Sequence, residues 1–263
     1  MKEVLATPEA AAKWVDDVGL ALLFPNLDYV LPSLWEAISG ELELQWAIRS
    51  DDGKFESFTP EMAKLWSWKD ELPRRRLACV GLHVARTSSL VAPRLVAPML
   101  ALTGRTAALD DFGDVDGLER DVATAALELG RPTSRRELRL LVGADKRTTD
   151  RAVNALQRKL VFTNAGRSDD EPGWPSTLHD LFARRWRTRL RRIPPREEAL
   201  RTLTLALLRS NSLSVADLAA SLRIRRSEAA ATLADLEASA NVRRADEDGL
   251  PIWQLRARQR ARR

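Results

Sequence analysis

The residues with the clearest chemical purpose form a row of hydrogen-bond donors near the middle of the chain. If residues 147–160 are helical, three arginines and one asparagine fall on one face, opposite an apolar stripe: Arg147, Arg151, Asn154 and Arg158 against Val153, Leu156 and Leu160. These donors suit phosphate oxygens and base edges, as in the reading helix of a helix-turn-helix fold. Thr148, which we count among the DNA contacts, Thr149 or Asp150 could also cap the helix start. An ordinary solvated helix face has the same pattern.

An 80-residue repeat predicts the fold that would position this row. Shifting the sequence by 80 aligns like residues without a gap: Leu127 with Leu207, Ser134 with Ser214, Glu137 with Asp217, Leu138 with Leu218, Val153 with Leu233 and Leu156 with Leu236. In each copy a Ser-x-x-acid box begins a second helix, a third helix follows, and extended segments with turns at 164–166 and 248–249 suggest a hairpin. We predict a mainly α fold with small β wings, built from tandem winged helices over 117–175 and 195–255.

The segments around these copies are rich in arginine. Residues 176–194 are expected to form a basic linker helix with Leu178, Leu181 and Phe182 turned inward. Its outward arginines would follow the phosphate backbone: Arg184, Arg185, Arg187 and Arg189.

The second copy differs from the first because its third helix carries acidic residues in place of the arginine row. It could still touch phosphates through Arg225, Arg226 and Arg243, or through the basic tail 256–263. The alternative is that it packs on its neighbour.

Net charge divides the chain into two halves of opposite sign. Residues 1–130 hold 13 Lys/Arg and 21 Asp/Glu, a net of −8; the remaining 29 and 16 give residues 131–263 a net of +13, and the two sum to +5. Double-stranded DNA is the natural partner of the basic half, although an acidic protein would satisfy the same charge. The acidic N-terminal half could itself take a protein partner.

The N-terminal region, residues 1–116, is acidic and rich in tryptophan. Thr7-Pro8 predicts a helix start, alternation over 42–46 predicts a strand, 88–102 suggests a helix, and 108–117 reads as a linker. The tryptophans are expected in the core, with a base-stacking platform as the alternative.

Several functional classes lack support in the sequence. The chain has no apolar run long enough to cross a bilayer and no secretory leader, so the expected location is cytoplasmic and nucleoid-associated. Cys79 is the single cysteine, and with only His83 and His179 beside it no Cys/His metal cluster is expected. No metal or other cofactor is predicted.

Three N-terminal segments resemble a known family: VGLALLFP at 18–25, LPSLWEAISG at 31–40 and WSWKDELPRR at 66–75. Together with the spacing of the two repeats, they are similar to the AlkZ/YcaQ winged-helix DNA glycosylases, and more closely to the AlkZ-related group. The resemblance implies a third winged-helix-like unit in the N-terminal half and a basic concave channel for DNA.

The glycosylase branch of that family places a Gln-apolar-Gln or Gln-apolar-Asp motif after its early helix, to position a water against the sugar. The matching segment here, 19–24, has no polar side chain. Glu43 and Gln45 are weak candidates for the missing polar group, and Asp28, Glu36 and Glu41 are further candidates. Each of them also fits a solvated surface residue. The prediction is therefore a duplex DNA-binding protein in damage recognition, repair or transcription control, without an evident catalytic site. A DNA glycosylase and a winged-helix protein-interaction module are the alternatives.

Overall fold

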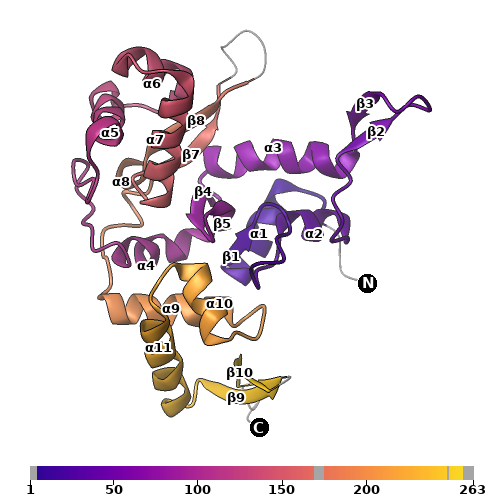
Figure 1. Cartoon of the computed structure of the whole chain (residues 1–263), viewed down its shortest axis with the longest axis vertical. Coiled ribbons are helices and arrows are strands. Elements are labelled where there is room, and N and C mark those ends of the chain that lie inside the picture. The colour runs from indigo at the N-terminus through magenta and orange to yellow at the C-terminus, as the bar shows by residue number, and fades with distance from the viewer. Residues whose placement is uncertain (1–4, 169–174, 248, 257–263) are drawn as a thin grey trace.

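The computed structural model describes residues 5–168, 175–247 and 249–256 (Figure 1). Its elements are helices and short antiparallel sheets, so the fold is mixed α/β with more strand than predicted. The elements form three successive units: in Figure 1 the first extends from the centre to the right, the second lies at the upper left and the third at the bottom.

The first unit contains the acidic, tryptophan-rich region. Its elements are α1 (Pro8–Val18), β1 (Leu20–Leu22), α2 (Leu34–Ser39), β2 (Ala47–Arg49), β3 (Phe55–Phe58), α3 (Pro60–Arg74), β4 (Cys79–Val84) and β5 (Thr87–Val91). A short 3-10 turn, η1 (Pro93–Leu95), and α4 (Val96–Ala101) follow it.

The second and third units contain the two sequence repeats. The second has α5 (Gly117–Leu129), β6 (Thr133–Ser134), α6 (Arg135–Val142), α7 (Lys146–Arg158), β7 (Phe162–Arg167) and β8 (Thr177–Leu181), and α8 (Phe182–Arg185) follows. The third has α9 (Arg196–Leu207), α10 (Val215–Leu222), α11 (Arg226–Ala238), β9 (Val242–Glu247) and β10 (Leu250–Leu255).

All three units share one order of elements: helix, strand, two helices and two strands. The first strand pairs with the last in each of the first two units, giving the strand orders β1-β5-β4 and β6-β8-β7. In the third unit an isolated bridge between Leu213 and Trp253 takes the place of the first strand, beside the β9–β10 pair. The first unit differs by the β2–β3 hairpin inserted before its third helix.

The same local signals shape the second helix of every unit. A serine caps each one by accepting a hydrogen bond from the backbone amide three residues on: Ser33 from Glu36, Ser134 from Glu137 and Ser214 from Asp217. A residue in the left-handed region ends each one: Gly40, Gly143 and Arg223. These features satisfy the amide and carbonyl groups that a helix leaves unpaired at its ends.

Two hydrophobic clusters form the core. One belongs to the second unit and includes Leu138, Leu156 and Phe162. The other runs without interruption from the first unit, through Trp35 among others, into the third unit, through Leu203 and its neighbours. The C-terminal repeat therefore shares its core with the N-terminal region.

Several elements differ from the sequence-based expectations. The linker helix expected over 176–194 is wrong, because 177–181 form strand β8 and only 182–185 are helical. No turn lies at 164–166: these residues belong to β7, where the register shifts between Asn164 and Gly166. The second hairpin is confirmed in β9 and β10.

Two further differences lie in the first unit. Residues 42–46 are not a strand, and Leu42 and Trp46 are exposed. The helix expected over 88–102 begins only at Val96, because 87–91 complete the sheet as β5.

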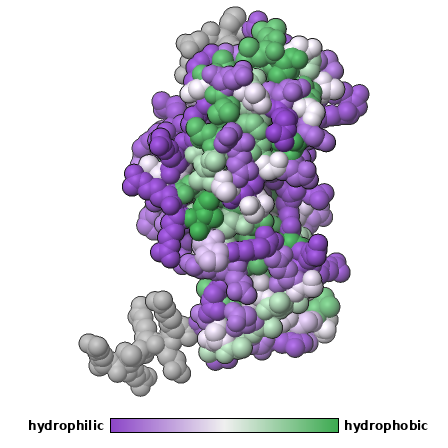
Figure 2. Space-filling view, turned by 90° about the vertical axis from the view of Figure 1, so that its left-hand side faces the viewer, coloured by the Kyte–Doolittle hydropathy of each residue, from purple (hydrophilic) through white to green (hydrophobic). Residues whose placement is uncertain are grey.

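The surface is that of a polar protein. The face shown in Figure 2 is predominantly hydrophilic, and its hydrophobic residues form separate patches. Among the residues that the structure describes, no helix is both long and apolar enough to cross a membrane.

Candidate nucleic-acid interface

The α7 row, which we define as Arg147, Arg151, Asn154 and Arg158, lies along one side of α7. The three arginines are exposed and Asn154 is half-buried. The opposite side of the helix is packed in the core of the second unit through Val153 and Leu156, both 0% exposed. Burial of the apolar stripe thus turns the donors outward.

The start of α7 is capped by a residue that the sequence reasoning missed. Asp145 is the N-cap, and its Oδ1 accepts from the Thr148 amide at 3.0 Å. The Thr148 hydroxyl donates to Asp145 Oδ2 at 2.7 Å. Thr148 is therefore engaged in capping, and the expectation that residues 148–150 supply the cap is wrong.

Arg135, at the start of α6, fixes the middle of the row. Its guanidinium donates to Asn154 Oδ1 at 2.6 Å and to Asp150 Oδ1 at 3.2 Å. Its Nε donates to His179 Nε2 at 3.1 Å. This side chain thereby connects α6 to α7 and β8. The sequence signal was weak, because an arginine after a serine cap is ordinary surface.

The C-terminal end of the α7 row, at Asn154 and Arg158, borders a cavity of about 590 Å³ between the first two units. We call it the α3–α7 pocket, lined by Trp66, Lys69, Asn154, Arg158, Asn164 and His179 among others. Figure 1 shows why it forms here: the C-terminal end of α3 reaches the second unit beside β7.

The α3–α7 pocket contains buried polar atoms whose hydrogen-bonding capacity is unmet. Trp66 Nε1, Asn164 Oδ1 and His179 Nδ1 are buried and have no partner among the described residues. An unsatisfied buried donor or acceptor costs about 1–3 kcal/mol, so natural folds rarely keep several together unless they serve a ligand or hold water.

The protonation state of His179 follows from its surroundings. Its side chain is 1% exposed, and burial, reinforced by the positive charges of Arg135 and Lys69, lowers its pKa to about 3. The ring is thus neutral at physiological pH. Because arginine can only donate, Nε2 must accept from Arg135 and the proton must lie on Nδ1.

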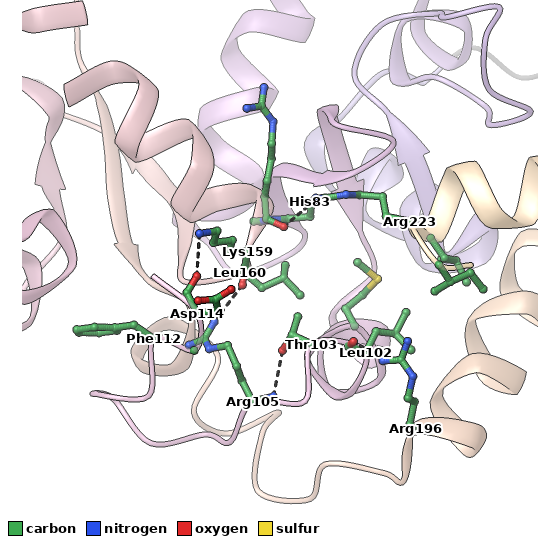
Figure 3. Close-up of a pocket in the computed structure, with 15 residues that line it drawn as sticks. His83, Leu102, Thr103, Arg105, Phe112, Asp114, Lys159, Leu160, Arg196 and Arg223 are labelled. Carbon is green, nitrogen blue, oxygen red and sulfur yellow. Dashed lines mark hydrogen bonds between the residues drawn. The ribbon is translucent and has the colours of Figure 1, made fainter. Parts of the chain in front are cut away.

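A second cavity, of about 300 Å³, lies where the three units meet and is rich in cations (Figure 3). Except for Arg158 of the α7 row, its cations are engaged by the protein itself. Arg105 donates to the carbonyl of Lys159 at 3.1 Å, Lys159 to that of Asp114 at 2.8 Å, and Arg223 to that of Arg158 at 2.8 Å. Burial lowers the pKa of Arg105 and Arg223. This cavity therefore lies at a contact between the units, where backbone carbonyls bind the cations.

The other predicted DNA contacts divide into two groups. Arg184 pairs with Asp180 at 2.7 Å, and Arg185 donates to the carbonyls of Pro73 and Arg74. Both hold the fold together, so they are poor candidates for phosphate contact. The remaining arginines are exposed: Arg187, Arg189, Arg225, Arg226 and Arg243. Of these, Arg243 donates to Gln254 Oε1 at 3.0 Å.

The candidate catalytic residues are not assembled into a site. Glu43 and Gln45 are exposed in the segment before β2, and their backbone carbonyls accept hydrogen bonds from the side chains of Trp35 and Thr59. Within the segment that would carry the Gln-apolar-Gln motif, 19–24, residues 20–23 are at most 2% exposed. Its leucine and alanine side chains offer no group to orient a water. Over the described ranges, no three His, Cys, Asp or Glu residues gather as a metal site.

Comparisons with known proteins identify related sequences and folds. The sequence model of a family described as AlkZ related matches residues 5–218. The structure is similar to that of Streptomyces sahachiroi DNA glycosylase AlkZ, with a TM-score of 0.56 and 15% identity over 93% of this chain. This chain spans 64% of that protein's length.

A Corynebacterium diphtheriae protein of 16% identity is also matched, over 76% of this chain and 40% of that one, with a TM-score of 0.23. The search of curated proteins found no match.

Proposed function

Because this chain belongs to the AlkZ-related family, we propose that it binds duplex DNA through the α7 row and acts in the recognition or repair of damaged DNA. The observation that carries the proposal is the exposure of Arg147, Arg151 and Arg158 along one side of a helix whose other side is buried. Exposed arginines in such a row can pair with phosphates or read guanine edges.

The repeated topology supports this reading of α7. We interpret each unit as a winged helix, in which the third helix is the element that enters a groove. In the second unit that helix is α7 and the wing is the β7–β8 pair. The equivalent helix of the third unit, α11, uses its acidic residues internally: Glu228 pairs with Arg196 at 2.7 Å and Asp235 with Arg201 at 2.8 Å. The second unit is therefore the main contact.

A non-catalytic role agrees better with the first unit than base excision does. Hydrolysis of a glycosidic bond needs a polar group that orients or deprotonates water. The apolar, buried segment 20–23 supplies none, and Glu43 and Gln45 line none of the cavities described above. We keep the glycosylase as the second candidate because the solved structure named above is one.

The test of DNA binding is the salt dependence of affinity for a labelled duplex, measured by fluorescence anisotropy. We expect Arg151→Ala with Arg158→Ala to weaken binding about tenfold or more and to reduce the slope of log affinity against log salt by about 2, because two phosphate contacts are lost. The matched control, Lys13→Ala with Arg209→Ala, removes the same charge from residues outside the row.

Two outcomes would contradict the proposal. Equal loss in both double variants would show that only net charge matters, and little salt dependence would favour a protein-interaction module. Abasic sites formed on an alkylated duplex by the wild type, and lost in Glu43→Ala or Gln45→Ala, would establish the glycosylase instead.

A further inference from the structure

Three arginines, one from each unit, lie near each other where the units meet, and we call this group the arginine junction: Arg86, Arg158 and Arg223. Arg86 lies in the turn between β4 and β5, Arg158 is the last residue of α7, and Arg223 is the C-cap of α10. All three are exposed, so a ligand can reach them from solvent.

Backbone contacts between the units hold the junction together. The amide of Ala85, the residue before Arg86, donates to the Ser221 carbonyl in α10 at 3.3 Å. Arg223 Nη1 donates to the Arg158 carbonyl at 2.8 Å. Arg158 and Arg223 also line the same cavity, which Figure 3 shows. The first and second units are thus both connected to the third at this point.

The junction holds positive charge that no carboxylate neutralises. Burial, and then the positive charges of Arg86 and Arg158, lower the pKa of the Arg223 guanidinium, so the three charges repel each other. The Tyr29 side chain acts in the opposite direction, but a phenol is neutral near pH 7. Among the described residues, no Asp or Glu forms an ion pair with any of the three arginines.

The neighbouring cations differ from the junction because they have counterions. Lys159 and Arg196 line the same cavity, and they pair with Glu119 and Glu228, each at 2.7 Å. The junction instead keeps three like charges close together without a counterion. Such a group of cations attracts an anion from solution.

The charge and shape of the junction indicate which anion fits. A guanidinium presents a fork of N–H donors that matches two oxygens of a phosphate. A phosphate monoester carries about −1.5 to −2 charges at pH 7 and has three acceptor oxygens, so each oxygen can face one arginine. A diester of the DNA backbone carries a single charge and would leave most of the positive charge unneutralised.

We propose that the arginine junction binds one phosphate monoester group through Arg86, Arg158 and Arg223. Such a group occurs at the 5′ end of a broken or nicked DNA strand, and also in free phosphate compounds. The inference goes beyond the proposed function, which concerns duplex DNA along the α7 row. Only a DNA source of the phosphate rests on that function.

The first experiment needs no DNA and uses the full chain. Thermal unfolding is followed at pH 7.5 with inorganic phosphate, which is mainly a dianion there, and with dimethyl phosphate, a diester, at equal ionic strength. We expect inorganic phosphate at about ten times its dissociation constant to raise Tm by about 2 °C or more. Dimethyl phosphate should have little effect.

The second experiment places the same group in DNA. Two nicked duplexes differ only at the nick, which carries a 5′-phosphate in one and a 5′-hydroxyl in the other, and an intact duplex is the reference. We expect the full chain to bind the phosphate nick about fivefold or more tightly in fluorescence anisotropy, which is the effect of one or two hydrogen bonds to a charged group.

The variants Arg86→Gln and Arg223→Gln each remove one charge and keep a polar side chain. Neither residue belongs to the α7 row, so affinity for the intact duplex should stay near that of the wild type. Both should abolish the rise in Tm and lower the nick ratio to about 2 or less. The matched control is Arg209→Gln, at an exposed arginine of the third unit that lines neither cavity described above. If one junction variant fails to fold, the other decides.

The outcomes identify the source of the phosphate or overturn the site. Discrimination between the nicks would identify a DNA end, whereas a rise in Tm with equal binding of both nicks would identify a free phosphate compound. Equal stabilisation by dimethyl phosphate would overturn the monoester assignment, and so would an equal loss of intact-duplex affinity in the junction variants. The absence of any response to phosphate, or the same losses in Arg209→Gln, would overturn the site. Failure to bind the intact duplex would overturn only the proposed function.

Discussion

Two buried histidines, His83 and His179, make the stability of the fold depend on pH. His83 Nδ1 donates to the Gln157 carbonyl at 2.9 Å, and burial lowers the pKa of His83 to about 4. His179, buried beside Arg135, has a pKa of about 3. Both rings must be neutral for the first two units to pack as they do.

This neutrality predicts an acid-sensitive fold. In the unfolded chain each imidazole has a pKa near 6.5, so the unfolded state binds more protons below that pH. The stabilisation is fully present above pH 6.5 and is lost as pH falls toward about 4 for His83 and about 3 for His179. We expect the free energy of unfolding to fall by about 1 kcal/mol per histidine between pH 6.5 and 5.5.

Urea unfolding at pH 6.5 and 5.5 measures this loss. A double variant with His83→Gln and His179→Gln serves as the control, because glutamine keeps hydrogen-bonding capacity and does not titrate. The same pH dependence in the double variant would show that other groups are responsible.

At the scale of elements, the serine caps predicted from the sequence are found in the structure at the starts of α6 and α10. Ser214 accepts from the Asp217 amide at 3.1 Å, and Asp217 Oδ2 accepts from the Ser214 amide at 2.9 Å. We expect Ser214→Ala to lower the free energy of unfolding by about 1 kcal/mol, since a cap is lost at the start of α10. Thermal or urea unfolding measures this loss.

Ser214→Thr is the matched control, because threonine can keep the cap, and it should lie near the wild type. A loss in the threonine variant as large as in the alanine variant would mean that packing at this position, and not capping, sets the stability.

Strand β8 shows where prediction of elements from the sequence fails. The segment 177–181 reads as the inner face of an amphipathic helix, but it forms β8 and pairs with both β6 and β7. Local periodicity does not reveal a partner that lies 46 residues away, as in the Thr133–His179 pair. Tertiary pairing overrides the local preference there.

At the scale of the whole molecule, the two hydrophobic clusters predict two cooperative parts. The first and third units share one cluster, which also includes Leu160 and two residues of α8, and the second unit has its own. We expect Leu203→Ala, at a residue 0% exposed in the shared cluster, to speed amide hydrogen exchange in both the first and third units. Leu156→Ala should act mainly on 117–181. Each substitution should cost about 2–5 kcal/mol.

Hydrogen exchange followed by mass spectrometry resolves these parts by peptide. Faster exchange confined to 195–255 in the Leu203 variant would contradict a shared core. It would mean that the first and third units behave as independent domains.

The sequence by itself determined the charge separation, the 80-residue repeat, the serine caps and the apolar stripe of α7. These features depend on residues within a few positions of each other, or on composition, and need no partner. A third copy of the cap, Ser33 with Glu36, was also in the sequence and could have revealed the first unit as another repeat.

Only the tertiary structure decided which arginines face solvent and where the buried polar atoms meet. Arg184 and Arg185 look equivalent to Arg187 and Arg189 in the sequence, yet the first pair is engaged inside the fold. The α3–α7 pocket joins residues up to 113 positions apart, from Trp66 to His179 (179 − 66), and chain proximity carries no trace of that. Contacts between units arise from packing of whole elements, so the site exists only once the fold is complete.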